Sequence, residues 1–427
     1  MRVLRRPWPV LLLIVAGAWV AAAIGARRQG CEQDEVPWRV PTVKRACGVR
    51  MRVLVDSGEF MARLEEDLRD AQRYVGLQAM SFEGDDAGAR ITRALAACPA
   101  PCKQLLVDSY SRFVISDKFR LLPKHWHDDA LRRESDLTRR SLATLRRNNV
   151  AVKLTNPMDP LLIRFMARNH KKMVVIDDRV GYLGGINFCD HNFAWHDMMI
   201  RIEGDDAVGF LREDFLSTWR GVNQSVQRDF GGLWLAILDG RCNERSLAPI
   251  VRAIGRARRS IVVESGYASF PFFGWLRAAR ERGVSVVLLT PELNNKPPVK
   301  DNLLWEATRA GFEIRLYPGR MNHLKAMLID DATLVAGSSN FDYVAHTVQQ
   351  EVVMVVTDPD AVEEFRAKVL GPDLDGSVPY TGHVSALGGW PRHAAMRAGA
   401  TVMVGLVRML ESLVGTPEPE WAEEWRT

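Results

Sequence analysis

The sequence predicts an α/β protein of two homologous halves, each a mixed sheet flanked by helices, with one site at their interface. Three observations predict this fold. A pattern of His, Lys, Asp and Asn occurs twice with one fixed offset. Apolar strand-like runs alternate with helical stretches in both halves. Finally, 47% of the 427 residues are hydrophobic, which is sufficient for two cores of ordinary size.

The repeated pattern reads H-x-K-x4-D, followed after six further residues by G-x-x-N. Each member of the second copy lies 153 positions after its counterpart. The members are His170, Lys172, Asp177 and Asn187 in the first copy, and His323, Lys325, Asp330 and Asn340 in the second. One short motif carries a high risk of chance occurrence, whereas two copies with matched spacing indicate a duplicated unit.

Each copy predicts a β-hairpin. The apolar runs 173–176 and 326–329 follow the two lysines and have the length of buried strands. Side chains two apart on a strand point to the same side, so His and Lys share one face. The pairs Asp177-Asp178 and Asp330-Asp331 then predict turns. The hairpins therefore present His, Lys and Asn at one edge.

Further strands and helices repeat around these hairpins. The expected strands are Tyr74 to Leu77, Leu105 to Val107, Val150 to Leu154, Ile261 to Glu264, Val286 to Leu289 and Phe312 to Leu316, with a helix from Trp275 to Arg282. Their alternation predicts one sheet per half. We expect domains at 47–230 and 231–385, joined near Gly231-Gly232. An N-terminal segment at 1–28 and a C-terminal amphipathic helix and tail at 386–427 flank them.

The doubled residues suit a phosphate diester. Lysine and asparagine donate hydrogen bonds, so Lys172, Asn187, Lys325 and Asn340 predict a cage of donors around phosphate oxygens. One histidine can attack phosphorus while the other protonates the leaving oxygen. The lysines supply positive charge, so we expect neither a metal ion nor another cofactor in this reaction.

A histidine nucleophile needs an acceptor at its second ring nitrogen. Asp197 lies 27 residues after His170, and Glu351 lies 28 residues after His323. Both begin or adjoin apolar strand-like runs. We therefore predict that these two carboxylates orient the histidines.

The two copies, N-H-K-K-M-V-V-I-D-D and N-H-L-K-A-M-L-I-D-D, resemble the phospholipase D superfamily. The segments W-H-D-M-M-I-R-I-E-G at 195–204 and F-L-S-T-W at 215–219 look most like bacterial cardiolipin synthases. The resemblance covers residues 50–370. It implies that His170 is the nucleophile and His323 the acid and base, with the lysines and the aspartates Asp177 and Asp330 completing the catalytic motifs. One departure is Tyr343-Val344, where these synthases usually have an Arg-Ser pair.

The resemblance implies a membrane-associated phosphatidyltransferase that makes cardiolipin from phosphatidylglycerol through a phosphohistidine. A hydrolase yielding phosphatidic acid, a nuclease and a non-catalytic lipid-binding protein are the alternatives. The net charge of +5 fits an anionic substrate or membrane surface. We expect no nucleic-acid partner, because the chain lacks a dense basic tract interleaved with aromatic residues.

Residues 7–26 at the N-terminus form an uncharged apolar run of bilayer-spanning length. We expect an uncleaved anchor in a bacterial-type cell membrane. Export with cleavage near Ala21-Ala22-Ala23 is the alternative. Arginines flank both ends of the run, so its orientation stays open.

The six cysteines leave two interpretations. An exported chain permits disulfides, for which Cys31 with Cys47 and Cys98 with Cys102 are the natural pairs. A cytoplasmic chain would hold six free thiols. Cys189 follows the first G-x-x-N segment, and we interpret it as a packing residue.

Two more segments invite interpretation. Residues 109–140 contain His125, His127, Asp128 and Asp129, which resemble a metal cluster but lack a matching distant ligand, so we expect a polar loop or lid. Residues 394–414 predict a helix with two faces, which either docks on the domain or lies on lipid. Its polar face would hold Arg397, Arg408 and Glu411, and its apolar face Val402, Leu406, Met409, Leu410 and Leu413.

Overall fold

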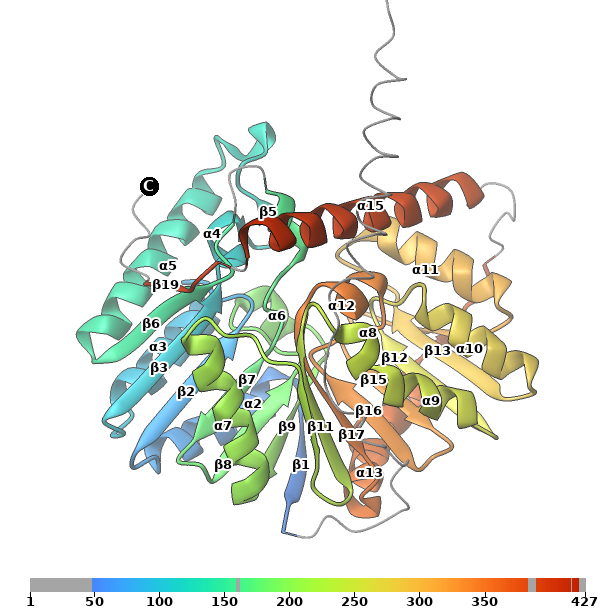
Figure 1. Cartoon of the computed structure of the whole chain (residues 1–427), viewed down its shortest axis with the longest axis horizontal. Helices are drawn as coiled ribbons and strands as arrows, with labels where there is room; N and C mark the ends of the chain where they lie inside the picture. The colour runs from blue at the N-terminus through green and yellow to red at the C-terminus, as the bar shows by residue number, and fades with distance from the viewer. Residues whose placement is uncertain (1–47, 159–161, 383–388, 416, 422–427) are drawn as a thin grey trace, which may run out of the picture.

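The computed structural model describes residues 48–158, 162–382, 389–415 and 417–421. Two mixed sheets with flanking helices stand next to each other, which confirms the predicted α/β fold (Figure 1). Residues 7–26, for which we expect a membrane anchor, lie outside the described ranges. Within those ranges, none of the helices combines the length and hydropathy required to cross a bilayer.

The first sheet has the strand order β1-β9-β8-β7-β2-β3-β6-β19. Strands β2, β3 and β6 pair in parallel, and their neighbours pair antiparallel. The strands are β1 (Arg50–Val55), β2 (Tyr74–Ala79), β3 (Cys102–Asp108), β6 (Val150–Thr155), β7 (Met173–Ile176), β8 (Val180–Gly184), β9 (Met198–Glu203) and β19 (Glu420–Trp421). The last of these comes from the C-terminal tail, which therefore completes the first sheet rather than standing apart from it.

The second sheet repeats this arrangement in the order β10-β11-β17-β16-β15-β12-β13-β14-β18. The strands are β10 (Val226–Asp229), β11 (Leu233–Asp239), β12 (Ser260–Ser265), β13 (Ser285–Pro291), β14 (Glu313–Tyr317), β15 (Lys325–Ile329), β16 (Thr333–Gly337), β17 (Gln350–Val356) and β18 (Val378–Pro379). The expected join at Gly231-Gly232 is the turn between β10 and β11. The second sheet therefore begins at Val226, before the boundary expected from the sequence.

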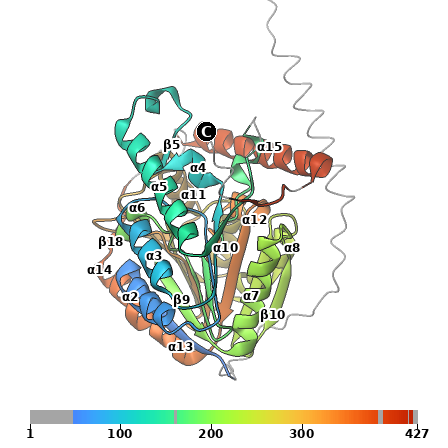
Figure 2. The ribbon, with the colours of Figure 1, turned by 90° about the vertical axis from the view of Figure 1, so that its left-hand side faces the viewer.

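Helices flank both sheets. In the first half these are α2 (Asp56–Arg69), α3 (Asp86–Ala97), α4 (Tyr110–Phe113), α5 (Asp129–Arg147), α6 (Asp190–Ala194) and α7 (Asp205–Trp219). In the second half they are α8 (Asn243–Ser246), α9 (Ala248–Arg256), α10 (Phe272–Glu281), α11 (Pro297–Arg309), α12 (Tyr343–Thr347), α13 (Pro359–Phe365) and α14 (Gly371–Gly376). Two of the helices, α7 and α13, pack into the core that the two sheets share. Figure 2 shows α2, α3 and α5 together on the outer side of the first sheet.

The segment 109–140 is more ordered than the loop expected from the sequence. It contains α4, a short hairpin of β4 (Val114–Ile115) and β5 (Lys118–Phe119), a turn of 3₁₀ helix (Pro123–His125) and the start of α5. Helix α5 begins at Asp129 because the Asp128 carboxylate accepts the Leu131 backbone N–H at 3.1 Å, a typical N-cap. In the described part of the chain, the groups of side chains that lie close enough together to hold a metal ion do not include His125, His127, Asp128 or Asp129.

Both predicted hairpins form. In the first, Met173 pairs with Leu183 across β7 and β8. In the second, Ala326 pairs with Ala336 across β15 and β16. The paired aspartates of both turns have φ between 52° and 58°. Aspartate tolerates this left-handed region because its short side chain can accept nearby backbone hydrogen bonds.

Apolar cores stabilise each half and join the two halves to each other. One lies between the first sheet and its outer helices, and another lies in the same place in the second half. The third draws on both sheets at once: Met173 and Leu183 of the first half share it with Ala326 and Met354 of the second. A core common to both sheets fixes their relative position, and with it the distance between the two hairpins.

Helix α15 (Trp390–Val414) runs across both halves at the top of Figure 1. It docks on the protein through Val404 and Val407, which pack against Ala167 of the first half and Val348 of the second. The helix therefore docks, but through a different face from the one expected. Of the residues assigned to the apolar face, Met409 and Leu413 are exposed at the surface.

The cysteines follow neither interpretation in full. Cys98 and Cys102 are both free thiols, so the pairing expected between them is wrong. Cys189 is also free and is buried. Cys242 is disulfide-bonded. The expected pair of Cys31 and Cys47 lies outside the described residues.

Candidate active site

The two hairpins meet where the halves face each other. His170 and Lys172 lie at the start of β7, and His323 and Lys325 lie at the start of β15. All four side chains are buried. Both histidines line one cleft of about 370 Å³, together with Asn187 and Asn340. The structure thus brings the histidine, lysine and asparagine residues of both copies to one place.

Backbone hydrogen bonds cross from each half to the other at this point. The His170 N–H donates to the Gln350 carbonyl at 2.8 Å. The His323 N–H donates to the His196 carbonyl at 2.7 Å. Gln350 and His196 directly precede Glu351 and Asp197. Each histidine is therefore attached to the segment that carries the carboxylate of the opposite half.

The side chains cross in the same way. His170 Nδ1 lies 3.0 Å from Glu351 Oε1, and His323 Nδ1 lies 2.7 Å from Asp197 Oδ2. With a carboxylate as acceptor, each Nδ1 carries the hydrogen and each Nε2 keeps its lone pair. The sequence spacing suggested Asp197 and Glu351 as orienting carboxylates but gave no sign that each serves the histidine of the other half.

The lysines stand directly beside the histidine backbones. Lys172 Nζ donates to the His170 carbonyl at 2.8 Å. Lys325 Nζ makes the equivalent bond to His323 and lies 3.2 Å from its Nε2. Each ammonium group is therefore held within its own hairpin, where a phosphate oxygen between the histidines would meet positive charge from both sides.

The two copies accommodate their carboxylates differently. A Cβ on Gly185 would lie 2.2 Å from Asp197 Oδ1, so only glycine fits beside this carboxylate. The matching residue of the second copy, 153 positions later, is Ser338, whose hydroxyl donates to Glu351. The glycine and the serine of the repeated segments thus both serve the orienting carboxylates.

Burial disfavours positive charge throughout the cage. It lowers the pKa of His170 to about 4, against the opposing effect of Glu351. It lowers the pKa of His323 to about 3, and Lys325 adds to this effect. It also lowers the pKa of Lys172 to about 7, with Glu351 opposing. At neutral pH both imidazoles are therefore neutral, and Nε2 of each keeps a lone pair with which it can act as a nucleophile or base; at His323 this atom lies 3.2 Å from Lys325 Nζ.

The asparagines are placed differently from each other. Asn187 accepts the Ser81 backbone N–H at 3.2 Å and donates to Asn192 at 2.7 Å. The Oδ1 atom of Asn340 is buried and makes no hydrogen bond within the described structure. Asn187 is thus fixed by neighbours, whereas Asn340 keeps an unsatisfied polar atom in the wall of the cleft.

Asp177 and Asp330 do not belong to the site, which corrects their assignment as catalytic residues. Each follows its strand at the end remote from the lysine, five residues or roughly 16 Å away. The Asp177 carboxylate accepts three successive backbone N–H groups, from Gln72, Arg73 and Tyr74. Asp330 does the same with residues 258–260. Both aspartates close the turn and tie the hairpin to the neighbouring strand.

Other residues of the site had no clear signal in the sequence. The rings of Trp195 and Tyr267 lie 4.9 Å and 5.8 Å from the His323 ring, one from each half. Lys171, between the two motif residues, points to the opposite side of its strand. There its ammonium group forms a buried ion pair of 2.7 Å with Asp214. The alternation of a strand predicts this opposite direction, but not the partner.

Anion binding should draw protons into this cage. A dianion adds negative charge beside Lys172, His170 and His323, so it raises pKa values that burial has lowered, and these groups take up protons at pH 7. Calorimetric titration of the protein with tungstate, in buffers of different ionisation enthalpy, should give uptake on the order of one proton. The Lys172→Met variant should take up clearly less. Binding with no proton uptake, or with release, would contradict the buried neutral cage.

Comparison with known proteins agrees with this geometry. The family model described as "Cardiolipin synthase, PLD-like domain" matches residues 45–219 and 250–370. Cardiolipin synthase B of Salmonella typhi is 25% identical over 354 residues, which cover 76% of this chain and 80% of that protein. Major cardiolipin synthase ClsA of Bacillus subtilis (strain 168) is 23% identical over 337 residues, covering 72% of this chain and 65% of the relative.

Among solved structures, phosphatidylserine synthase of Haemophilus influenzae Rd KW20 has a similar fold, with a TM-score of 0.58. The identity is 14%, and the alignment covers 86% of this chain and 97% of that one. The sequence match extends over more than half of the chain and contains both histidine–lysine hairpins. This chain therefore belongs to the phospholipase D-like family of the cardiolipin synthase type.

Proposed function

We propose that this protein is a phosphatidyltransferase that condenses two phosphatidylglycerol molecules into cardiolipin and releases glycerol. The observation that carries the proposal is the crossed cage, in which two neutral histidines, each held by a carboxylate, share one cleft beside two lysines. Family membership and the cardiolipin synthases among the relatives support the choice of reaction.

In the first half-reaction, His170 Nε2 attacks phosphorus and the bond from phosphorus to the glycerol headgroup oxygen breaks. Glu351 keeps the hydrogen of His170 on Nδ1 and stabilises the positive ring that forms. The departing oxygen takes a proton from His323, which the bound phosphodiester has helped to protonate. Lys172 and Lys325 balance the negative charge on the phosphoryl oxygens.

The second half-reaction reverses these roles. The hydroxyl of a second phosphatidylglycerol attacks phosphorus, His323 accepts its proton, and the bond to His170 breaks. As cardiolipin leaves, His323 releases this proton to the solvent, and the cage returns to its neutral state. Assigning the nucleophile to His170 rests on the family resemblance, because the cage alone is nearly symmetric.

The lining of the cleft supports a lipid substrate. Besides the polar cage, its wall contains Met80, Phe165, Phe270, Tyr343 and Met396. Such a mixture suits a ligand with an anionic centre and apolar chains. Hydrolysis to phosphatidic acid is the second candidate, because water in place of the lipid alcohol would complete the same cycle at the same residues.

The identity of the acceptor decides between these two reactions. Purified full-length protein in mixed micelles of labelled phosphatidylglycerol should form cardiolipin and glycerol, with phosphatidic acid as the minor product. Thin-layer separation of the labelled lipids measures the ratio. If phosphatidic acid dominated at every phosphatidylglycerol density, the protein would be a phospholipase that uses the same cage.

The two histidines should fail at different steps. Rapid quenching with lipid labelled in the phosphate should trap a covalent adduct in the wild type and none in His170→Ala, because Nε2 forms the bond to phosphorus. Turnover should fall at least about 10³-fold in both His170→Ala and His323→Ala.

The crossed carboxylates give this experiment an internal control. Glu351→Gln should slow formation of the adduct, since it acts on His170. Asp197→Asn should impair His323 instead, and should therefore slow both formation of the adduct and transfer to the second alcohol. Accumulation of the adduct in His170→Ala would reverse the two roles.

We also propose that residues 7–26 hold the protein at a cell membrane as an uncleaved anchor. A lipid substrate and an uncharged apolar run of this length support the proposal. The full chain should then sediment with membranes and resist carbonate extraction, and mass spectrometry should find the original N-terminus. A mature chain that begins after the Ala21-Ala22-Ala23 segment would instead indicate export with signal cleavage.

A further inference from the structure

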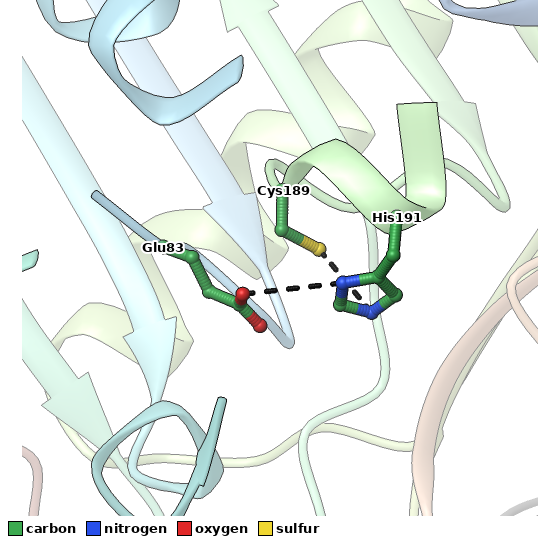
Figure 3. A group of neighbouring side chains, drawn as sticks. All are labelled: Glu83, Cys189 and His191. Atoms are coloured by element: carbon green, nitrogen blue, oxygen red, sulfur yellow. Dashed lines mark hydrogen bonds and ion pairs between the residues drawn. The ribbon is translucent and has the colours of Figure 1, made fainter. Parts of the chain in front are cut away.

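A second group of reactive side chains lies beside the cage and takes no part in the proposed reaction. Glu83, Cys189 and His191 each offer one ligand atom, and these atoms lie within 4.8 Å of one another (Figure 3). Cys189 Sγ is 3.7 Å from His191 Nε2, and Glu83 Oε2 is 3.9 Å from His191 Nδ1. Asp117 Oδ1 lies 3.9 Å from His191 Nε2. Glu83 is 2% exposed and Cys189 is fully buried.

The negative charge of this group has no matching cation. Glu83 also clusters with Asp85 and Glu134. In the part of the chain that the structure describes, His191 is the one basic side chain within ion-pair distance of these three carboxylates. A buried carboxylate in such a place must either keep a proton or meet a cation.

The geometry points to a cation. Zinc bonds of about 2.0–2.3 Å in a tetrahedron place neighbouring ligand atoms roughly 3.3–3.8 Å apart. His191 Nε2 lies near this separation from two of the groups, at 3.7 Å from Cys189 Sγ and 3.9 Å from Asp117 Oδ1. With one ligand atom taken from each residue, those of Glu83, Cys189 and His191 all lie within 4.8 Å of one another. Thiolate and imidazole together select zinc-like ions over magnesium or calcium. We propose that Glu83, Cys189 and His191 bind one zinc-type divalent cation, with Asp117 or a water molecule as the fourth ligand.

Such an ion would act on the architecture of the cleft and not on phosphorus. Cys189 and His191 lie at the start of α6, Glu83 follows β2, and Asp117 lies in the turn of the β4–β5 hairpin. The ion would therefore join the segment 109–140, present in the first half alone, to the wall of the cleft. His191 packs on Trp195, which packs on His323. Cys189 would then be a ligand and not the packing residue expected from the sequence.

Cobalt titration of the untagged full-length protein, after dialysis against a chelator, tests this site. Thiolate ligation gives Co²⁺ an intense near-ultraviolet charge-transfer band, so we expect this band to saturate at about one ion per chain, and zinc to displace it. Cys189→Ser should abolish the band. Cys98→Ser and Cys102→Ser should keep it, because these thiols lie outside the group.

Two further variants keep the test decisive if Cys189→Ser does not fold. Glu83→Gln and His191→Gln should each weaken Co²⁺ binding at least about tenfold, and circular dichroism checks that they are folded. A protein that binds no stoichiometric cobalt or zinc would overturn the proposal in favour of a protonated Glu83. So would a band that survives in Cys189→Ser. Neither result depends on which lipid reaction the cage performs.

Discussion

The crossed attachment of each histidine to the opposite half is the constraint on which the rest of the site depends. His170 is held by the Gln350 carbonyl and the Glu351 carboxylate, and His323 by the corresponding groups at 196 and 197. Neither half can orient its own histidine. The core common to both sheets is therefore required to hold either imidazole, so packing of the two halves against each other and assembly of the site are coupled.

Although the cage is nearly symmetric, the residues behind it are not. Behind His170, Gln78 donates to Asn169 at 2.7 Å. Behind His323, Asn322 donates to the buried Glu264 at 2.6 Å. His196, whose carbonyl accepts the His323 N–H, lies between Asp56 and Asp373, at 2.7 Å and 2.8 Å from their carboxylates. Burial lowers the pKa of His196, but the hydrogen bonds to these two carboxylates outweigh that effect and raise the pKa to about 10. The buried Arg168–Asp108 ion pair, to which the Asn169 N–H donates at 2.6 Å, thus lies behind His170, whereas Glu264 and the His196 network lie behind His323. This difference gives the duplicated residues a physical basis for unequal roles.

The sequence predicted what local pattern controls. Strand periodicity and the doubled spacing were sufficient for both hairpins and for the convergence of histidines and lysines. They could not reveal that each carboxylate orients the histidine of the opposite half, because the spacings of 27 and 28 residues between each histidine and the next carboxylate do not say which histidine the carboxylate binds. The sequence also could not predict which face of α15 docks on the protein. Apolar residues occur on most sides of this helix, so periodicity alone could not select Val404 and Val407. Strand β19 has only two residues, which is too short to show a strand periodicity in the sequence.

The repeated cage recognises a phosphodiester, so discrimination between lipid headgroups must come from parts that are not repeated. Helix α15 is one of them, because Met396, Arg397 and Ala400 line the cleft. Tyr343 and Val344 pack against the cluster that docks this helix, and the ring of Tyr343 stacks on that of Phe270 with 4.5 Å between the ring centroids. The Arg397 guanidinium lies over the same Phe270 ring, 4.3 Å from its centroid. Helix α15 therefore brings a cation to the cleft from the C-terminal part of the chain, so a contact between Arg397 and a headgroup would not depend on the duplicated motifs.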